Sequence, residues 1–259
     1  MGDVLNNKSA KTTLGVGVNI FGRIWALWGL VTFLTTFLII FIPAMLSHLM
    51  KEPVGQKYFI AVSKIWMNVW LFLIGCPVKV SGKENFKPDE AYIVVFNHNA
   101  LLDVPLSAPY VPGANKTIAK ASFAKIPVFG QFYARGSVLV DRSNDRSRSK
   151  SFDAMKKVLA KGMHMCIYPE GTRNRSKEPI KPFYDGAFRL AMATKKDIMP
   201  CVIIGTKSAM PINKKFFLLP VKLKMQFLAP ETPANKTVTE LKEKVHSEML
   251  KVYVKEFGV

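Results

Sequence analysis

The chain has 259 residues and carries 37 Lys and Arg against 18 Asp and Glu, which gives a formal net charge of +19. This length suffices for one large domain, or for one domain with an anchor. The charge favours an anionic partner, either nucleic acid or an acidic membrane surface with phosphorylated substrates. Cys76, Cys166 and Cys201 are odd in number and widely spaced, which argues against a disulfide framework and CxxC metal spacing. The four histidines form no HExxH arrangement, so the sequence predicts no metal site.

An uncharged apolar segment, residues 24–46, is long enough to cross a bilayer. A shorter apolar segment, residues 58–75, is interrupted by Lys64 and holds two tryptophans, which suit the headgroup region. Two lysines lie between the segments, and positive charge disfavours translocation of that connection. We therefore expect residues 1–76 to form a tail and a membrane-anchoring helical hairpin that dips into one leaflet. Two full spans, or packed core helices of a soluble protein, are the alternatives.

From residue 77 to residue 259, short apolar runs alternate with amphipathic segments. This pattern predicts an α/β domain with a central, mostly parallel sheet flanked by helices. Apolar residues at helical spacing predict helices over residues 147–161, 185–194 and 238–257. The apolar runs predict strands within residues 78–80, 92–96, 117–119, 138–140, 165–168, 199–204 and 221–227.

The most informative motif, Asn97-His98-Asn99-Ala100-Leu101-Leu102-Asp103, follows the second predicted strand. A neutral imidazole can accept a proton near pH 7, and a carboxylate can fix its tautomer. Five residues is a poor spacing within one straight helix, where neighbours on a face are three or four apart. The pair can therefore meet only if His98 lies in a turn and Asp103 lies in the first turn of the next helix. Taken alone, the string is equally compatible with a solvated turn histidine.

Charged residues follow three further predicted strands. Lys120 closes one strand, and Arg142 ends the segment Gly136-Ser137-Val138-Leu139-Val140-Asp141-Arg142. Ligands bind at such strand ends in α/β sheets, so the cations predict a phosphate site near His98.

The fifth predicted strand leads into Tyr168-Pro169-Glu170-Gly171-Thr172-Arg173. Gly171 permits close approach of the backbone to a ligand, Thr172 offers a hydroxyl, and Arg173 supplies a planar fork that matches phosphate oxygens. Glu170 suits a bond to a substrate hydroxyl or to Arg173. A capped turn with a surface Glu–Arg pair explains this string equally well.

The motif His98-x4-Asp103, the segments 136–142 and 170–173, and the strand at 200–203 stand in the order of the four sequence blocks of glycerolipid acyltransferases. The chain most resembles the 1-acylglycerol-3-phosphate (lysophosphatidic acid) acyltransferase family, over roughly residues 76–230. Three positions depart from the usual pattern. Ala100 stands where many members have serine, Tyr168 replaces a common phenylalanine, and Asn174 follows Arg173 where serine is frequent.

The resemblance implies transfer of a fatty acyl group from acyl-CoA or acyl-carrier protein to the 2-hydroxyl of 1-acylglycerol 3-phosphate, which gives phosphatidic acid. It implies His98 as the general base and Asp103 as the carboxylate that orients it. Arg173, with Lys120 and Arg142, would grip the acceptor phosphate. Glu170, Gly171 and Thr172 would lie along the acceptor. Neither a metal nor a cofactor is implied besides the acyl donor.

We expect the protein to bind a membrane phospholipid surface, at the cytoplasmic face of a membrane such as the bacterial inner membrane, and to bind no nucleic acid. The basic surface would hold the domain against anionic lipid and assist docking of an acidic acyl carrier. A different acceptor, such as glycerol 3-phosphate or another lysolipid, stays open. A non-catalytic basic protein that binds membranes or nucleic acid is a second alternative, although the sequence holds no helix-turn-helix, zinc or RRM-like motif.

Overall fold

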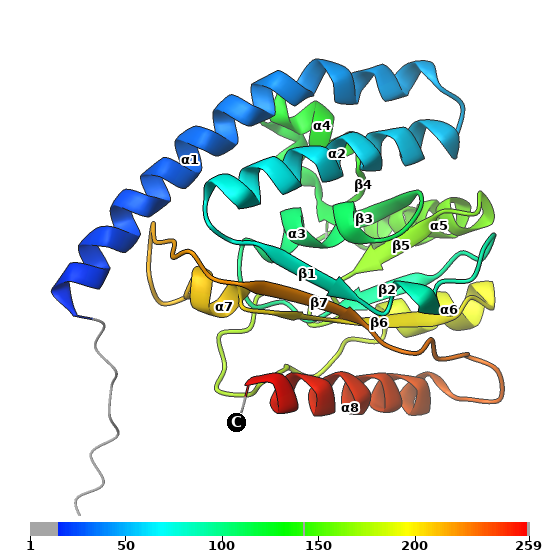
Figure 1. Ribbon diagram of the computed structural model, residues 1–259. Coiled ribbons are helices and arrows are strands. Elements are labelled where there is room, and N and C mark those ends of the chain that lie inside the picture. Colours follow the sequence, from blue (N-terminus) through cyan, green and yellow to red (C-terminus); the bar gives the residue numbers. More distant parts are fainter. Residues whose placement is uncertain (1–14, 142, 258–259) are drawn as a thin grey trace, which may run out of the picture.

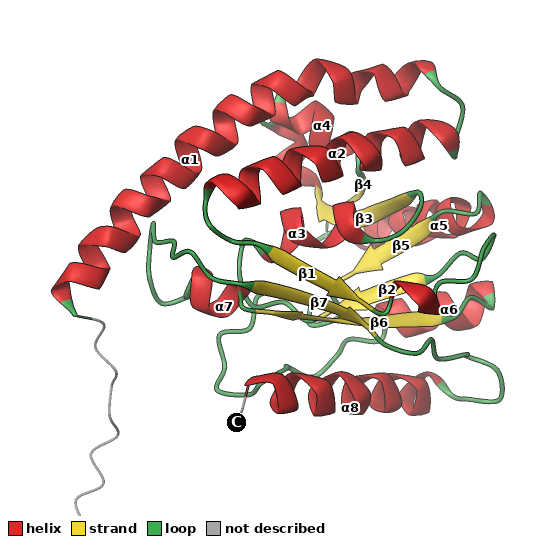
Figure 2. Cartoon of the chain, in the orientation of Figure 1, coloured by secondary structure: helices red, strands yellow, loops and turns green. Residues whose placement is uncertain are grey.

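Seven strands form one sheet at the centre of the computed structural model, which describes residues 15–141 and 143–257 (Figures 1 and 2). Their order across the sheet is β1-β7-β6-β2-β5-β3-β4. Every neighbouring pair is parallel except β6 and β7, which confirms the mostly parallel sheet. The strands are β1 (Val78–Ser81), β2 (Ile93–Phe96), β3 (Asn115–Lys120), β4 (Ser137–Val140), β5 (His164–Ile167), β6 (Ile198–Ile204) and β7 (Leu223–Phe227).

Five of these strands, β6, β2, β5, β3 and β4, run in the same direction, so their carboxyl ends share one edge of the sheet. The central strands β2 and β5 bury every residue, because helices cover both faces of the sheet. A strand that is covered on both faces consists of a continuous run of apolar residues. This is why the sequence predicted both β2 and β5.

The hairpin layer covers one face of the sheet (Figure 1). Helix α1 (Val16–Met45) continues into the short 3-10 helix η1 (Leu46–Leu49), and the chain returns through α2 (Val54–Leu73). Helix α3 (Asp103–Tyr110) lies between α2 and the sheet, and α4 (Phe129–Arg135) packs against both helices of the hairpin. Two further 3-10 helices, η2 (Lys83–Asn85) and η3 (Ala121–Lys125), stand in loops. The expected tail, residues 1–14, lies outside the described residues.

The opposite face of the sheet carries α5 (Asp145–Ala160), α6 (Gly186–Thr194) and α8 (Val238–Phe257). These are the three predicted helices, displaced by at most two residues. The sequence did not predict α4, nor α7 (Thr206–Ala209) after β6. Both are short, so neither holds enough turns to display an amphipathic period.

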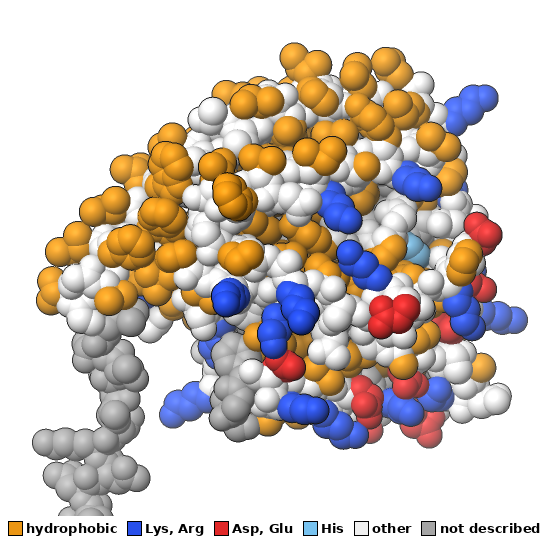
Figure 3. Space-filling model, in the orientation of Figure 1, with side chains coloured by type: hydrophobic (Ala, Val, Ile, Leu, Met, Phe, Trp, Pro, Cys, Tyr) orange, Lys and Arg blue, Asp and Glu red, His pale blue; other side chains and the backbone are white. Residues whose placement is uncertain are grey.

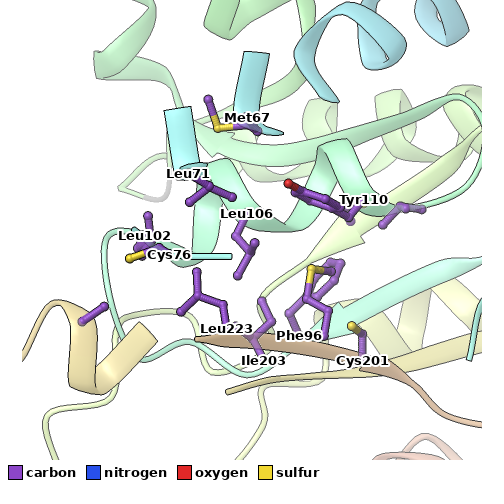
Figure 4. Packing of buried hydrophobic residues seen from close by; sticks show 14 of the residues in the cluster. Met67, Leu71, Cys76, Phe96, Leu102, Leu106, Tyr110, Cys201, Ile203 and Leu223 are labelled. Carbon is purple, nitrogen blue, oxygen red and sulfur yellow. The ribbon is translucent and has the colours of Figure 1, made fainter. Parts of the chain in front are cut away.

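Two apolar cores join the sheet to its helical layers. On the hairpin side, Met67 and Leu71 of α2 pack over Leu106 of α3 and over Phe96 and Ile203 of the sheet (Figure 4). On the other side, the buried residues include Leu241, Val245, Met249 and Tyr253, which α8 presents at helical spacing. The three cysteines are buried and unpaired.

The outer surface of the hairpin is apolar (Figure 3). By length and composition, the helical stretch Val16–Leu49 is the one candidate for crossing a membrane among the described residues. The two tryptophans of α2, for which the sequence suggested a headgroup position, do not lie at the protein surface. Trp66 and Trp70 are buried between the helices, where their indole N–H groups donate to Thr36 Oγ1 and to the Gly29 carbonyl. They join α1 to α2, and large apolar side chains, most of them aliphatic, are exposed on the outer surface of the hairpin.

Candidate active site

His98 and Asp103 meet at the carboxyl end of β2. His98 lies in the turn after the strand, and Asp103 is the first residue of α3, as the spacing predicted. The distance between His98 Nδ1 and Asp103 Oδ2 is 2.9 Å. The Asp103 side chain is fully buried, and that of His98 is 14% exposed. This geometry excludes a solvated turn histidine.

Two backbone donors also bind the Asp103 carboxylate, at the same oxygen that contacts His98. Oδ2 also accepts the N–H groups of Asn99 at 2.6 Å and of Ala100 at 2.7 Å. Three donors on one oxygen suit a carboxylate, so His98 Nδ1 carries the shared proton and Nε2 is the ring nitrogen that can accept another. The contact at position 100 comes from the backbone N–H, so it does not depend on the side chain there.

Tyr168 contacts both His98 and the segment that carries Asp103. Its ring packs against the imidazole of His98, with 4.4 Å between the ring centroids. Its hydroxyl lies 2.8 Å from the Asp103 carbonyl oxygen and 2.8 Å from Ser107 Oγ. Burial raises the pKa of Tyr168 well above its usual value, so the phenol stays neutral. A phenylalanine at this position could pack in the same way but could not bind Asp103 and Ser107.

Two asparagines connect the turn that carries His98 to other parts of the fold through hydrogen bonds. The side chain of Asn97 accepts from the Ile203 N–H at 2.7 Å and donates to the Ile203 carbonyl at 2.9 Å, which joins the end of β2 to β6. Asn99 Nδ2 donates to the Tyr253 hydroxyl of α8 at 3.1 Å. The turn that carries His98 is therefore held from the sheet and from the distant C-terminal helix.

Glu170 connects this turn to the one that follows β5. Its Oε1 accepts the His98 N–H at 2.6 Å, and its Oε2 accepts the Lys181 N–H at 3.2 Å. Burial raises the pKa of Glu170 to about 7, although both backbone donors act in the opposite direction. The sequence left two partners open for Glu170, a substrate hydroxyl and Arg173. Within the described residues no ion pair joins Glu170 to Arg173, so the second alternative is not supported.

A cavity of about 590 Å³ opens at these two turns. Two of the predicted binding residues, Thr172 and Arg173, line it together with His98. Lys181 also lines it, and its Nζ donates to Thr172 Oγ1 at 2.9 Å. Arg175 is a third cation of the lining. The sequence analysis predicted neither Lys181 nor Arg175 as a binding residue. Arg175 could have been predicted, because it alternates with Arg173 in the same loop.

Among the remaining predicted binding residues, the two that the structure describes, Gly171 and Lys120, do not line the cavity. Gly171 takes φ 72° in the turn beside Glu170, a conformation that favours glycine. Lys120 is exposed at the end of β3, two strands from β2 and so roughly 10 Å away along the sheet. It lies outside the lining of the cavity. Arg142 lies outside the described residues. In the described part of the chain, no group of three or more His, Cys, Asp and Glu side chains is arranged to hold a metal ion.

Known proteins are similar to this chain in sequence and in fold. Residues 77–204 match the protein family described as Acyltransferase. The 1-acyl-sn-glycerol-3-phosphate acyltransferase of Chlamydomonas reinhardtii is 30% identical over 179 residues, which cover 67% of this chain and 53% of the relative. The Helicobacter pylori protein of the same name is 30% identical over 167 residues, which cover 63% of this chain and 70% of the relative. The chain thus spans about half the length of the algal protein.

The same fold occurs in the crystal structure of the 1-acyl-sn-glycerophosphate acyltransferase from Thermotoga maritima. The TM-score is 0.78 at 24% sequence identity, and the match covers 93% of this chain and 98% of that chain. This likeness confirms the mostly parallel sheet preceded by a pair of long apolar helices. The sequence relatives and the family match establish the kinship that the four sequence blocks suggested. The chain belongs to the family of 1-acyl-sn-glycerol-3-phosphate acyltransferases.

Proposed function

We propose that this protein transfers a fatty acyl group from a thioester donor to the 2-hydroxyl of 1-acylglycerol 3-phosphate and so forms phosphatidic acid. One observation carries the proposal: the buried His98–Asp103 pair adjoins a cavity whose lining holds three cationic side chains. A base beside a cluster of cations fits a substrate that bears both a reactive hydroxyl and a phosphate. The names of the sequence relatives support this acceptor.

In this mechanism His98 moves one proton from the acceptor hydroxyl to the leaving thiolate. His98 Nε2 takes the proton of the 2-hydroxyl while the hydroxyl oxygen attacks the thioester carbonyl carbon. When the tetrahedral intermediate collapses, the C–S bond breaks and the imidazolium returns the proton to the leaving sulfur, so a free thiol departs. Asp103 holds the Nδ1 proton throughout and stabilises the imidazolium. Glu170 and Tyr168 keep the imidazole in place through its backbone and its ring face.

The acceptor phosphate binds to the cations of the cavity. Arg173 offers a planar fork for two phosphate oxygens, and Lys181 and Arg175 add positive charge from the same lining. Thr172 offers its hydroxyl, and Gly171 lets the glycerol approach the backbone. Lys120, exposed at the end of β3, adds positive charge along the carboxyl edge of the sheet. Arg142 is proposed as a further phosphate ligand from its place in the sequence alone.

Residues 1–76 anchor the protein and residues 77–259 catalyse the reaction. The hairpin lies in one leaflet at the cytoplasmic face of the membrane, with its exposed aliphatic side chains among the acyl chains. Both lysophosphatidic acid and phosphatidic acid reside in the same leaflet, so this anchor keeps the site beside its substrate. The donor is acyl-CoA or acyl-carrier protein, which present the same thioester chemistry.

The decisive experiment is an acyl-transfer assay with purified protein in phospholipid vesicles. Each donor is paired with lysophosphatidic acid, glycerol 3-phosphate or lysophosphatidylcholine, and the products are identified by mass spectrometry. We expect phosphatidic acid as the main product and a loss of about 10²–10⁴-fold in rate for His98→Ala. His48→Ala, which removes an exposed histidine of η1, is the matched control. A His98→Ala rate equal to that of the wild type would refute the mechanism, and transfer only to another acceptor would refute the substrate.

A further inference from the structure

The segment between β3 and α4 displays large apolar side chains on the surface. Phe123, Ile126 and Val128 are each 44% exposed, and they stand within six residues of one another. Connecting loops usually carry small and polar residues at such positions. A cluster of exposed apolar side chains marks a surface that contacts another molecule or a membrane.

A rare backbone turn carries Val128, the last of these three side chains. Val128 has φ 62° and ψ −59°, and the Phe129 N–H donates to the Pro127 carbonyl at 2.6 Å, which defines a γ-turn of the strained kind. For a β-branched residue this left-handed φ is an outlier. Gly130 allows the turn to close, since a Cβ there would lie 2.2 Å from the Ala124 carbonyl oxygen. Strain that the surrounding structure maintains at an exposed turn points to a role for that turn.

A row of aromatic rings connects this turn to the hairpin. Phe37 of α1 lies 5.7 Å from Phe129, Phe129 lies 5.8 Å from Tyr133, and Tyr133 lies 5.6 Å from Phe123, between ring centroids. Helix α4 accordingly stands against α1, on the same side of the sheet (Figure 1). Leu38, the next residue along α1, is 65% exposed. The exposed apolar side chains of the turn and of the hairpin therefore belong to segments that pack against each other.

Positive charge flanks the same turn. Lys120 and Lys125 are exposed on either side of Phe123. Both lie close to Asp141, whose pKa is held below its usual value first by hydrogen bonds from Ser143 and also by these two ammonium groups. Apolar side chains that project between lysines fit the boundary of an anionic bilayer, where acyl chains meet phosphate groups.

We propose that residues 121–128 form a second membrane contact, in which Phe123, Ile126 and Val128 enter an anionic bilayer and Lys125 binds lipid phosphate. This inference deepens the proposed function and rests on its membrane-bound hairpin. The segment follows β3, whose carboxyl end lies on the same edge of the sheet as His98. With contacts at the hairpin and at this turn, the domain cannot pivot on the hairpin, and the edge that carries the active site stays against the lipid surface.

Site-specific fluorescence quenching in vesicles tests this contact on the full chain. The natural cysteines are fully buried, so a cysteine introduced at the surface is labelled selectively. Ile126→Cys reports on the turn, Leu38→Cys on the hairpin, and Ser247→Cys on the exposed surface of α8, across the sheet. Each variant carries an environment-sensitive label and binds phosphatidylglycerol vesicles that contain lipids with a nitroxide high in the acyl chain.

We expect the labels at positions 126 and 38 to lose at least about half of their emission, and the label at 247 to lose almost none. If position 126 behaves like 247 while position 38 is quenched, the second contact is refuted and the hairpin anchor stands. If neither is quenched, the anchor fails together with the contact. Ser122→Cys, a nearly isosteric change at an exposed residue of η3, gives an independent reading should Ile126→Cys fail to fold.

Discussion

The two long helices on opposite faces of the sheet, α1 and α8, distribute their residues in opposite ways. Helix α8 buries large apolar side chains such as Val245 and Met249 and turns charged residues outward. Helix α1 buries mostly small residues, including Gly22 and Gly29, and exposes large aliphatic ones such as Leu38. Figure 3 shows the result as an apolar surface over α1 and α2. Small residues inside and large apolar residues outside are the packing pattern of helices in lipid.

This contrast fits the proposed membrane anchor, in which lipid surrounds the hairpin and water surrounds α8. Water drives the large side chains of α8 against the sheet. The two helices of the hairpin are held together by aromatic contacts such as that of Phe37 with Trp66, and by indole hydrogen bonds such as that of Trp70 to the Gly29 carbonyl. The active-site turn receives support from both layers. Ser107 of α3 contacts Tyr168 on the hairpin side, and Tyr253 of α8 binds Asn99 on the other.

The polar attachment of the hairpin gives the largest expected effect. Arg135 is buried and bonds Glu52 Oε1 at 2.7 Å, Gln56 Oε1, and Ser47 Oγ at 3.0 Å. Arg135→Ala leaves these groups without their cation, so the free energy of unfolding should fall by about 3–5 kcal/mol. Denaturant titration in detergent micelles measures the change. Arg189→Ala, at a side chain that is 69% exposed, should cost under about 1 kcal/mol. Equal losses would show that this network does not hold the hairpin.

A matched pair of truncations compares the two helices directly. Met249 of α8 is fully buried, so Met249→Ala should lower the free energy of unfolding by about 2–5 kcal/mol. Leu38→Ala, on the exposed side of α1, should change it by less than about 0.5 kcal/mol in detergent. In vesicles, the same Leu38→Ala change should weaken membrane binding in a flotation assay. A destabilisation by Leu38→Ala as large as that by Met249→Ala would contradict the lipid-facing assignment.

Between the layers, Glu170 makes stability depend on pH. Its pKa is raised from 4.5 to about 7 by burial, so the folded state holds this proton more tightly than the unfolded state. The resulting stabilisation is complete below about pH 4.5 and disappears as the pH rises through 7, a loss of about 3 kcal/mol.

Glu170→Gln should remove this contribution while keeping an acceptor for the His98 N–H. Unfolding titrations at pH 5 and pH 7.5 should therefore show a larger drop for the wild type than for the variant. Parallel pH curves would show that Glu170 titrates as an ordinary carboxyl group.

The smallest effect concerns the support that the water-facing layer gives to the active site. Tyr253→Phe removes the hydroxyl that accepts from Asn99 Nδ2, which should cost about 1 kcal/mol of stability. The freed Asn99 loosens the turn that carries His98, so kcat should fall severalfold with little change in KM. Steady-state kinetics beside Tyr184→Phe, at a tyrosine that is 70% exposed, separate this effect from a general one. An unchanged kcat would mean that α8 only stabilises the fold.

The amino-acid sequence by itself determined the strands, the α/β class and the meeting of His98 with Asp103. Strands covered on both faces must be continuous apolar runs, as in β2 and β5, and a five-residue spacing permits one geometry of contact. These features depend on local periodicity, which a single sequence records.

Only the tertiary structure determined which residues far apart in the sequence contact each other. The antiparallel pairing of β7 with β6, the bond between Asn99 and Tyr253, and the burial of Trp66 and Trp70 join segments that no local pattern relates. The same holds for Glu170, for which the sequence left open a substrate hydroxyl or Arg173, while the fold directs its carboxylate to the backbone of His98. Such contacts follow from how the layers pack, because buried polar groups take whichever partners the packed chain brings within reach.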